Sequence, residues 1–144
     1  MIIRKAQIDD LSPLVELACL HSATSGNDGD PLRVERAFAP LLIDDTYGVV
    51  LVAEDDEGVC AYAALTWGWS LEAGGAEALL DEFYVRDGGK GIGTSLLEAV
   101  MAAASARGVA RVFLETEAHN VQGRRFWMAR GFQVEDSVWL QREC

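Results

Sequence analysis

A glycine-rich segment near the middle of the chain constrains the fold more than any other feature. Residues 88–94 read Gly-Gly-Lys-Gly-Ile-Gly-Thr, with an apolar run, Leu79–Val85, before them and apolar residues at helical spacing after them. The pattern predicts a strand over 79–85 and a helix over about 92–107, which ends at Gly108 because glycine readily adopts the left-handed conformation of a helix end. With a next strand over 109–116, the unit is expected to form a right-handed parallel crossover.

The other segments predict a mixed, mostly antiparallel sheet with helices on both faces. Val49–Glu54 and Val59–Trp69 flank a turn-forming Asp-Asp-Glu-Gly segment and are expected to pair as a hairpin. Further strands are expected at Ile2–Ala6 and within 132–140, and further helices from a cap at Asp9 or Asp10 to about His21, from Asp30-Pro31 to about Leu42 and over Val121–Arg130, with a loop over Ser22–Asp30. The helix faces expected in the core are Leu14, Leu17, Ala18 and His21, and Leu96, Leu97, Val100 and Met101. A chain of 144 residues is expected to be a single α/β domain over 1–144.

Charge and cysteine usage exclude several classes of function. The net charge of −11 would repel a phosphate backbone, so no nucleic-acid partner is expected. No apolar run approaches the ~18 residues of a membrane span and no signal peptide is visible, so we expect a cytoplasmic protein with no membrane partner. The three cysteines are widely spaced and the two histidines lie far apart, so no metal site is predicted.

The glycine segment is suited to a phosphate group, because glycines let the backbone approach an anion and the N–H groups at a helix start attract it. Lys90 adds a positive charge. A dinucleotide G-x-G-x-x-G fingerprint fails, because its third glycine would fall on Thr94 or Leu96. A Walker A loop also fails, because it needs a lysine directly after Gly93. Both failures disfavour a nucleotide-binding oxidoreductase or kinase domain.

The strand, loop and helix resemble the cofactor motif of the GNAT superfamily of acyl-CoA-dependent N-acetyltransferases. That motif, (Arg/Gln)-x-x-Gly-x-(Gly/Ala), falls on Gly88, Gly91 and Gly93, and Gly88 stands where the family commonly has Arg or Gln. A second signature of the family is matched after the next strand by Asn120, Gly123, Phe126, Trp127, Gly131 and Phe132. The resemblance covers roughly residues 49–133 well and the N-terminal third in outline.

The resemblance implies a GNAT fold whose central parallel strands splay apart, with the pantetheine arm of acetyl-CoA in the gap. The backbone of Phe83, Tyr84 and Val85 would bind that arm, and the Phe83 N–H would polarise the thioester carbonyl. The pyrophosphate would bind the loop residues Gly89, Lys90, Gly91, Ile92, Gly93 and Thr94. Asn120, Phe126 and Trp127 would contact the cofactor from the other side.

Direct attack on a thioester needs a neutral amine, so a base must remove a proton from the ammonium form. Asp81 and Glu82 stand on the strand beside the expected thioester, and in the similar spermidine/spermine N-acetyltransferases an acid in this strand helps to remove that proton. Strict alternation would place the two on opposite faces, with Glu82 the first choice and Asp81 the second. Glu115 and Glu117 are further candidates.

The resemblance therefore implies transfer of an acetyl group to an amine of a small molecule or a peptide. The alternative is a non-catalytic acyl-CoA-binding domain, because Trp127 stands where many members carry a tyrosine that protonates the leaving thiolate, and an indole N–H has no useful acidity. The N-terminal helices and Thr66–Ser70 would shape the acceptor pocket. Within that segment, Trp67 and Trp69 share one strand parity, and packing on a sheet face is preferred over stacking on a cation. The sequence leaves a homodimer open.

Overall fold

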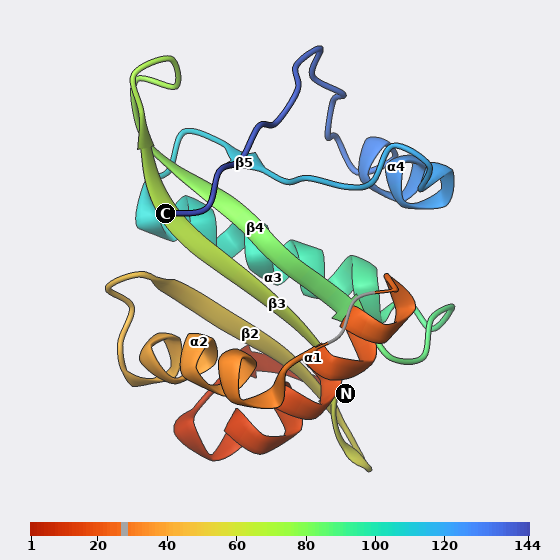
Figure 1. Ribbon diagram of the computed structural model, residues 1–144. Coiled ribbons are helices and arrows are strands. Elements are labelled where there is room, and N and C mark those ends of the chain that lie inside the picture. The colour runs from red at the N-terminus through yellow and green to blue at the C-terminus, as the bar shows by residue number, and fades with distance from the viewer. Residues whose placement is uncertain (27–28) are drawn as a thin grey trace. The chain divides into compact units, whose positions relative to one another are not determined.

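The computed structural model describes residues 1–26 and 29–144, so Asn27 and Asp28, within the predicted loop, lie outside the described residues. The described chain divides into two compact units, Met1–Leu114 and Glu115–Cys144. Each unit is described by itself, and the expectation of one domain over the whole chain stays a prediction. The first unit holds the sheet and the helices α1 to α3, and the second holds the helix α4 (Figure 1).

Within the described residues, the first unit has one five-stranded sheet with the order β1-β2-β3-β4-β5. Neighbouring strands from β1 to β4 are antiparallel, whereas β4 and β5 are parallel, as predicted for the crossover. The strands are β1 (Ile2–Lys5), β2 (Gly48–Asp55), β3 (Gly58–Ser70), β4 (Gly75–Val85) and β5 (Val112–Phe113). The predicted α/β class with a mixed sheet is confirmed.

Helices cover both faces of this sheet (Figure 1). On one face lie α1 (Leu11–Thr24), which follows the short 3₁₀ turn η1 (Ile8–Asp10), and α2 (Pro31–Ile43); on the other lies α3 (Ile92–Arg107). The core on the α1/α2 side is built from Leu14, Leu17, Ala18, Phe38 and Leu42 of the helices and Val50, Val52, Tyr62 and Ala64 of β2 and β3. Alternation sends their neighbours Leu51 and Ala63 to the other face, where α3 contacts both strands and buries Leu96, Leu97 and Val100.

Capping interactions set the ends of these helices. Asp30 Oδ1 accepts a hydrogen bond from the Leu32 N–H at 3.1 Å, and proline occupies the first helical position of α2. α3 ends at Gly108, whose φ is 82°. The Asp10 carboxylate makes no such cap for α1. It accepts instead from the Arg4 guanidinium at 2.8 and 2.9 Å and from the Gln7 N–H at 2.7 Å, which fastens β1 to the start of α1.

Two strand predictions for the last third of the chain are wrong. β5 is limited to Val112–Phe113 instead of 109–116, and residues 132–140, all described, contain no strand. A strand forms only where a neighbour completes its backbone hydrogen bonds, and an apolar pattern in one segment does not supply that neighbour. The helix predicted to end at Arg130 is α4, Val121–Met128.

One core prediction for α3 is also wrong. Met101 is 42% exposed, whereas Leu97 and Val100 are buried. Each residue turns the helix by about 100°, so Met101 lies beyond the edge of the stripe that faces the sheet.

Candidate functional site

β4 is paired along its whole length on one edge and only near its start on the other. Its register with β3 runs from Gly75 to Val85, whereas β5 pairs only with Ala78 and Leu79. The two parallel strands therefore part after Leu79, and the second half of β4 has no β5 partner in the described register. This is the splay that the resemblance implied.

Along this second half of β4, the main-chain N–H and C=O groups of successive residues point alternately toward β3 and away from it. The Arg86 N–H donates to the Cys60 carbonyl of β3 at 3.0 Å. Since hydrogen-bonded and non-hydrogen-bonded pairs alternate in an antiparallel ladder, Tyr84 also directs its main-chain groups to β3. Phe83 and Val85 direct theirs to the opposite edge, on the side where β5 has parted.

A register shift in β4 decides where the two candidate bases stand. Glu82 is the partner of Ala64, but the next pair joins Leu65 to Leu80, so Asp81 is an extra residue in β4. Such a bulge interrupts strict alternation. Glu82 is half-buried and Asp81 is exposed. Strict alternation of side chains therefore cannot assign Asp81 and Glu82 to opposite faces of the sheet, because the extra residue interrupts the two-residue period.

A buried tyrosine on the neighbouring strand holds the Glu82 carboxylate. The Tyr62 hydroxyl donates to Glu82 Oε1 at 2.7 Å, and the Tyr62 side chain is fully buried. Burial raises the pKa of Tyr62 far above its usual range, and the negative charge of Glu82 and, more weakly, of Asp81 adds to the rise. The hydroxyl therefore keeps its proton and remains a donor to one carboxylate oxygen.

Aromatic rings from three elements surround this pair. Phe38 of α2 meets the Tyr62 ring edge-on at 5.7 Å between centroids, and Tyr84 of β4 lies 6.3 Å from Tyr62. His21 of α1 packs on Tyr84 at 5.1 Å. The sequence analysis gave His21 only a place in the core and did not consider Tyr62. Pairing the two predicted strands in the correct register would have placed Tyr62 opposite Tyr84 and so close to Glu82.

The glycine loop after β4 has the geometry that its composition predicts. Gly89 and Gly91 have φ values of 84° and 77°, and Gly91 is the N-cap of α3. A Cβ added at Gly88, Gly89 or Gly91 would meet no heavy atom within 4 Å. Conformation rather than crowding therefore favours glycine at positions 89 and 91, and the backbone of the loop is open.

An N-cap without a side chain leaves the first turn of α3 without the usual side-chain acceptor. Intrahelical bonding does not use the N–H groups of the first turn, to which Ile92 and Gly93 belong. Together with the positive end of the helix dipole they suit an anion. This is the arrangement expected of a phosphate-binding loop.

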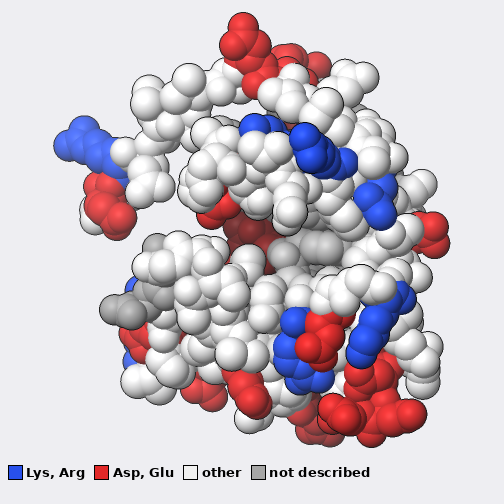
Figure 2. Space-filling model, turned by 90° about the vertical axis from the view of Figure 1, so that its right-hand side faces the viewer, with Lys and Arg blue, Asp and Glu red and all other residues white. Residues whose placement is uncertain are grey.

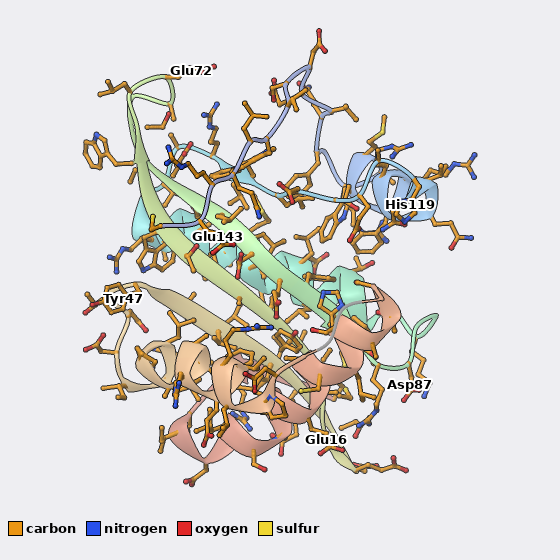
Figure 3. The ribbon with its side chains drawn as sticks, in the orientation of Figure 1. Glu16, Tyr47, Glu72, Asp87, His119 and Glu143 are labelled. Atoms are coloured by element: carbon orange, nitrogen blue, oxygen red, sulfur yellow. The ribbon has the colours of Figure 1, made fainter. Side chains whose placement is uncertain are left out.

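Two cations accompany the loop. Lys90 is exposed, and Arg86, which the sequence analysis did not single out, forms an ion pair with Asp87 at 3.5 Å. Figure 3 labels Asp87 in the loop that follows β4, at the end of the strand where Phe83 and Val85 lie. On the face drawn in Figure 2, basic side chains are intermixed with acidic ones.

The second unit has a polar arrangement of its own at the start of α4. Asn120 is the N-cap: its Oδ1 accepts from the Gly123 N–H at 3.0 Å, and its Nδ2 donates to Thr116 Oγ1 at 3.2 Å. A Cβ at position 123 would overlap the Asn120 side chain. Glycine is therefore required at position 123 of this signature because the Asn120 side chain lies directly against its backbone.

An aromatic cluster follows in the same unit. Trp127 lies edge-on to Phe126 and Phe132, at 4.8 and 5.5 Å between centroids, and the Arg130 guanidinium lies 3.8 Å above the Phe126 ring. Since each unit is described by itself, the positions of Asn120, Phe126, Trp127, Glu115 and Glu117 relative to β4 stay predictions.

Trp67 has a structural role at the far end of β3. Its Nε1–H donates to the Asp45 carbonyl at 2.8 Å, and the Arg107 guanidinium lies 4.7 Å from its ring. Arg107 is the last residue of α3, so Trp67 lies on the α3 face, whereas Glu82 lies on the α1/α2 face. Trp67 thus packs on a sheet face and in addition lies against a cation of the chain itself, so the two expected alternatives occur together. Trp69 is largely exposed.

The family model for the acetyltransferase (GNAT) family matches residues 15–132. That span includes β4, the glycine loop and the Asn120 signature. The chain belongs to the GNAT acetyltransferase family. No curated protein matches the chain significantly.

Solved structures with the same fold cover nearly all of this GNAT chain. An integron cassette protein from the mobile metagenome of Cole Harbour Salt Marsh is 27% identical, with a TM-score of 0.87 over 98% of this chain and 89% of its own. A possible acetyltransferase from Clostridium difficile 630 is 22% identical, with a TM-score of 0.87 over 99% and 97%. The ribosomal-protein-alanine N-acetyltransferase from Brucella melitensis biovar Abortus 2308 is 20% identical, with a TM-score of 0.76 over 99% and 100%. The last two likenesses concern the fold alone.

GNAT proteins generally use acetyl-CoA, and the residues present fit such a group. An open loop at a helix N-terminus suits a pyrophosphate, and the edge of β4 beyond Leu79 that faces away from β3 is the side that an amide-rich arm would occupy. Among the described residues, no His, Cys, Asp and Glu side chains gather in a set that could hold a metal ion. In the same residues no helix has the length and hydropathy needed to cross a membrane.

Proposed function

We propose that the protein is an N-acetyltransferase that moves an acetyl group from acetyl-CoA to a primary amine of a small molecule or a peptide by direct attack. The observation that supports this most strongly is the Glu82 carboxylate, held by the Tyr62 hydroxyl at 2.7 Å on the strand that parts from β5. A half-buried carboxylate with one fixed oxygen is suited to accept a proton from an incoming ammonium group.

Each part of the site has a defined task in this proposal. When bound, acetyl-CoA supplies an acyl thioester, which a neutral amine can attack. Glu82 Oε2 accepts the proton that the amine must lose, while Oε1 stays hydrogen-bonded to Tyr62. We also propose, as the family resemblance implies, that the Phe83 N–H polarises the thioester carbonyl.

The loop after β4 and the family's second signature also have tasks in this proposal. The backbone of Gly89–Thr94 and the Lys90 ammonium would bind the pyrophosphate. By the family resemblance, Asn120 and Phe126 would contact the cofactor and Trp127 would pack against the end of the pantetheine arm. We propose that the reaction takes place in the cytoplasm.

A second function is favoured by one specific residue. Trp127 has no acidic proton for the leaving thiolate, which would suit a non-catalytic acyl-CoA-binding domain. We prefer catalysis, because a thiol with a pKa of about 8.5 leaves as a thiolate without an acid.

The test is a panel of acceptors with release of the CoA thiol as the readout. Polyamines, aminoglycosides, amino acids and peptides are each incubated with the protein and acetyl-CoA. We expect thiol release that depends on the presence of an amine and gives an acetylated product by mass spectrometry. Tight acetyl-CoA binding with no acetylated product across the panel would favour the binding domain instead.

A further inference from the structure

Tyr62 places a hydroxyl in a layer of the core that is otherwise apolar. Its buried neighbours on the α1/α2 face include Leu14, Phe38 and Val52, and a phenylalanine would fill the same space. Burying a hydroxyl is unfavourable unless it is hydrogen-bonded, and the partner of this one is Glu82 Oε1. The Tyr62 hydroxyl therefore serves to bind Glu82 and is not needed to fill the core.

We propose that Tyr62 is a positioning residue for amine deprotonation: its hydrogen bond fixes the direction of the Glu82 carboxylate. This inference rests on the proposed function of Glu82 as the base. The Tyr62 ring is set by Phe38 of α2 and Tyr84 of β4, so the core of the domain determines where the hydroxyl points. The hydrogen bond from the Tyr62 hydroxyl then holds the Glu82 carboxylate in one orientation.

The charges around Tyr62 keep its hydroxyl a donor to Glu82. A hydroxyl that keeps its proton donates it to Glu82 Oε1, which leaves Oε2 as the oxygen that can accept a proton from an amine. Asp81 of β4 acts in the same direction, because its negative charge also raises the pKa of Tyr62 and keeps the proton on the hydroxyl. Among the described residues, Tyr84 of β4 and His21 of α1, whose ring packs on Tyr84, are further titratable groups beside this cluster.

The first test is the kinetics of Tyr62→Phe. We expect kcat to fall roughly 10-fold, the effect of losing one hydrogen bond to a charged group, while KM for acetyl-CoA stays within about twofold. Tyr47→Phe is the matched control, because the Tyr47 ring is exposed and Figure 3 shows it far along the sheet from Asp87. An unchanged kcat in a folded Tyr62→Phe protein would overturn the inference.

A double variant separates positioning from a general loss of structure. If Tyr62 acts through Glu82, Tyr62→Phe should change kcat/KM by less than about twofold in a Glu82→Gln background. The same 10-fold loss in both backgrounds would mean that Tyr62 acts independently of Glu82 and would contradict the proposal.

A measurement without acetyl-CoA tests the inference independently of the proposed function. In carboxyl-labelled protein, carbon-13 NMR observes the Glu82 carboxylate directly. We expect Tyr62→Phe to change the chemical shift of this carboxylate, because its hydrogen bond is lost, and Tyr47→Phe to leave it unchanged. That change, in a protein that acetylates no acceptor, would support the Tyr62–Glu82 coupling and refute the transferase; activity with an unchanged chemical shift would do the reverse.

Discussion

Replacing Gly91 with glutamate tests the proposed phosphate-binding loop at the residue that caps α3. Gly91 has a φ of 77° and open space where a Cβ would be added. A side chain there costs about 1–2 kcal/mol of folding free energy, which is the penalty for a left-handed L-residue. A carboxylate about 4 Å from a phosphate adds repulsion of roughly 4 kcal/mol at the effective dielectric constant of a protein surface. We therefore expect the Kd for acetyl-CoA to rise about 1,000-fold.

Two control variants separate charge from strain. Gly91→Ala carries the backbone penalty without the charge, so its affinity for acetyl-CoA should stay within a few-fold of wild type. Gly74, in the turn between β3 and β4, has a φ of 83° and equally open space around a Cβ. Gly74→Glu should thus lose the same stability as Gly91→Glu and keep its affinity. Calorimetric titration with acetyl-CoA reports all three, and wild-type affinity in a folded Gly91→Glu protein would refute this account of the loop.

Three further predictions concern the base, the leaving group and the fold. Glu82→Gln should lower kcat/KM by roughly 10²-fold, most at low pH, in a thiol-release assay; a larger loss in Asp81→Asn would make Asp81 the base. Trp127→Phe keeps an apolar ring, so activity should stay within a few-fold, and a 10²-fold loss would mean that the indole N–H takes part in the proton transfer. The Arg4 guanidinium, and secondarily the Gln7 N–H, hold the pKa of Asp10 below its usual range against the effect of burial. This depressed pKa contributes stability that is present above about pH 4 and is lost as the pH falls. In urea denaturation, Asp10→Asn should therefore lower the free energy of unfolding by about 2 kcal/mol at pH 7 and by much less at pH 3. Equal stability of the variant and the wild type at pH 7 would contradict the reasoning.

The sequence predicted those parts of the fold that local chemistry decides. α3 was placed at 92–107 because glycine stands at both of its ends and takes a left-handed conformation there. The β2–β3 hairpin followed from its turn, where the Glu57 N–H donates to Asp55 Oδ1 at 2.8 Å and Gly58 has a positive φ. In each of these cases a few neighbouring residues are sufficient to set the backbone.

The parts that the sequence did not predict depend on partners distant along the chain. The extra residue at Asp81 appears only when β4 is paired with β3, so alternation could not assign the faces of Asp81 and Glu82. The contact of Tyr62 with Glu82 joins residues 20 positions apart and needs the same register. The apolar pattern over 132–140 resembled a strand, but the described residues of this segment contain none.

Calorimetric titration of the wild-type protein with acetyl-CoA, NAD and ATP tests the central claim most directly. The glycine loop matches neither the dinucleotide fingerprint nor the Walker A pattern, and the chain belongs to the GNAT family. The account predicts tight binding of acetyl-CoA and none of NAD or ATP. Binding of NAD as tight as that of acetyl-CoA would contradict it.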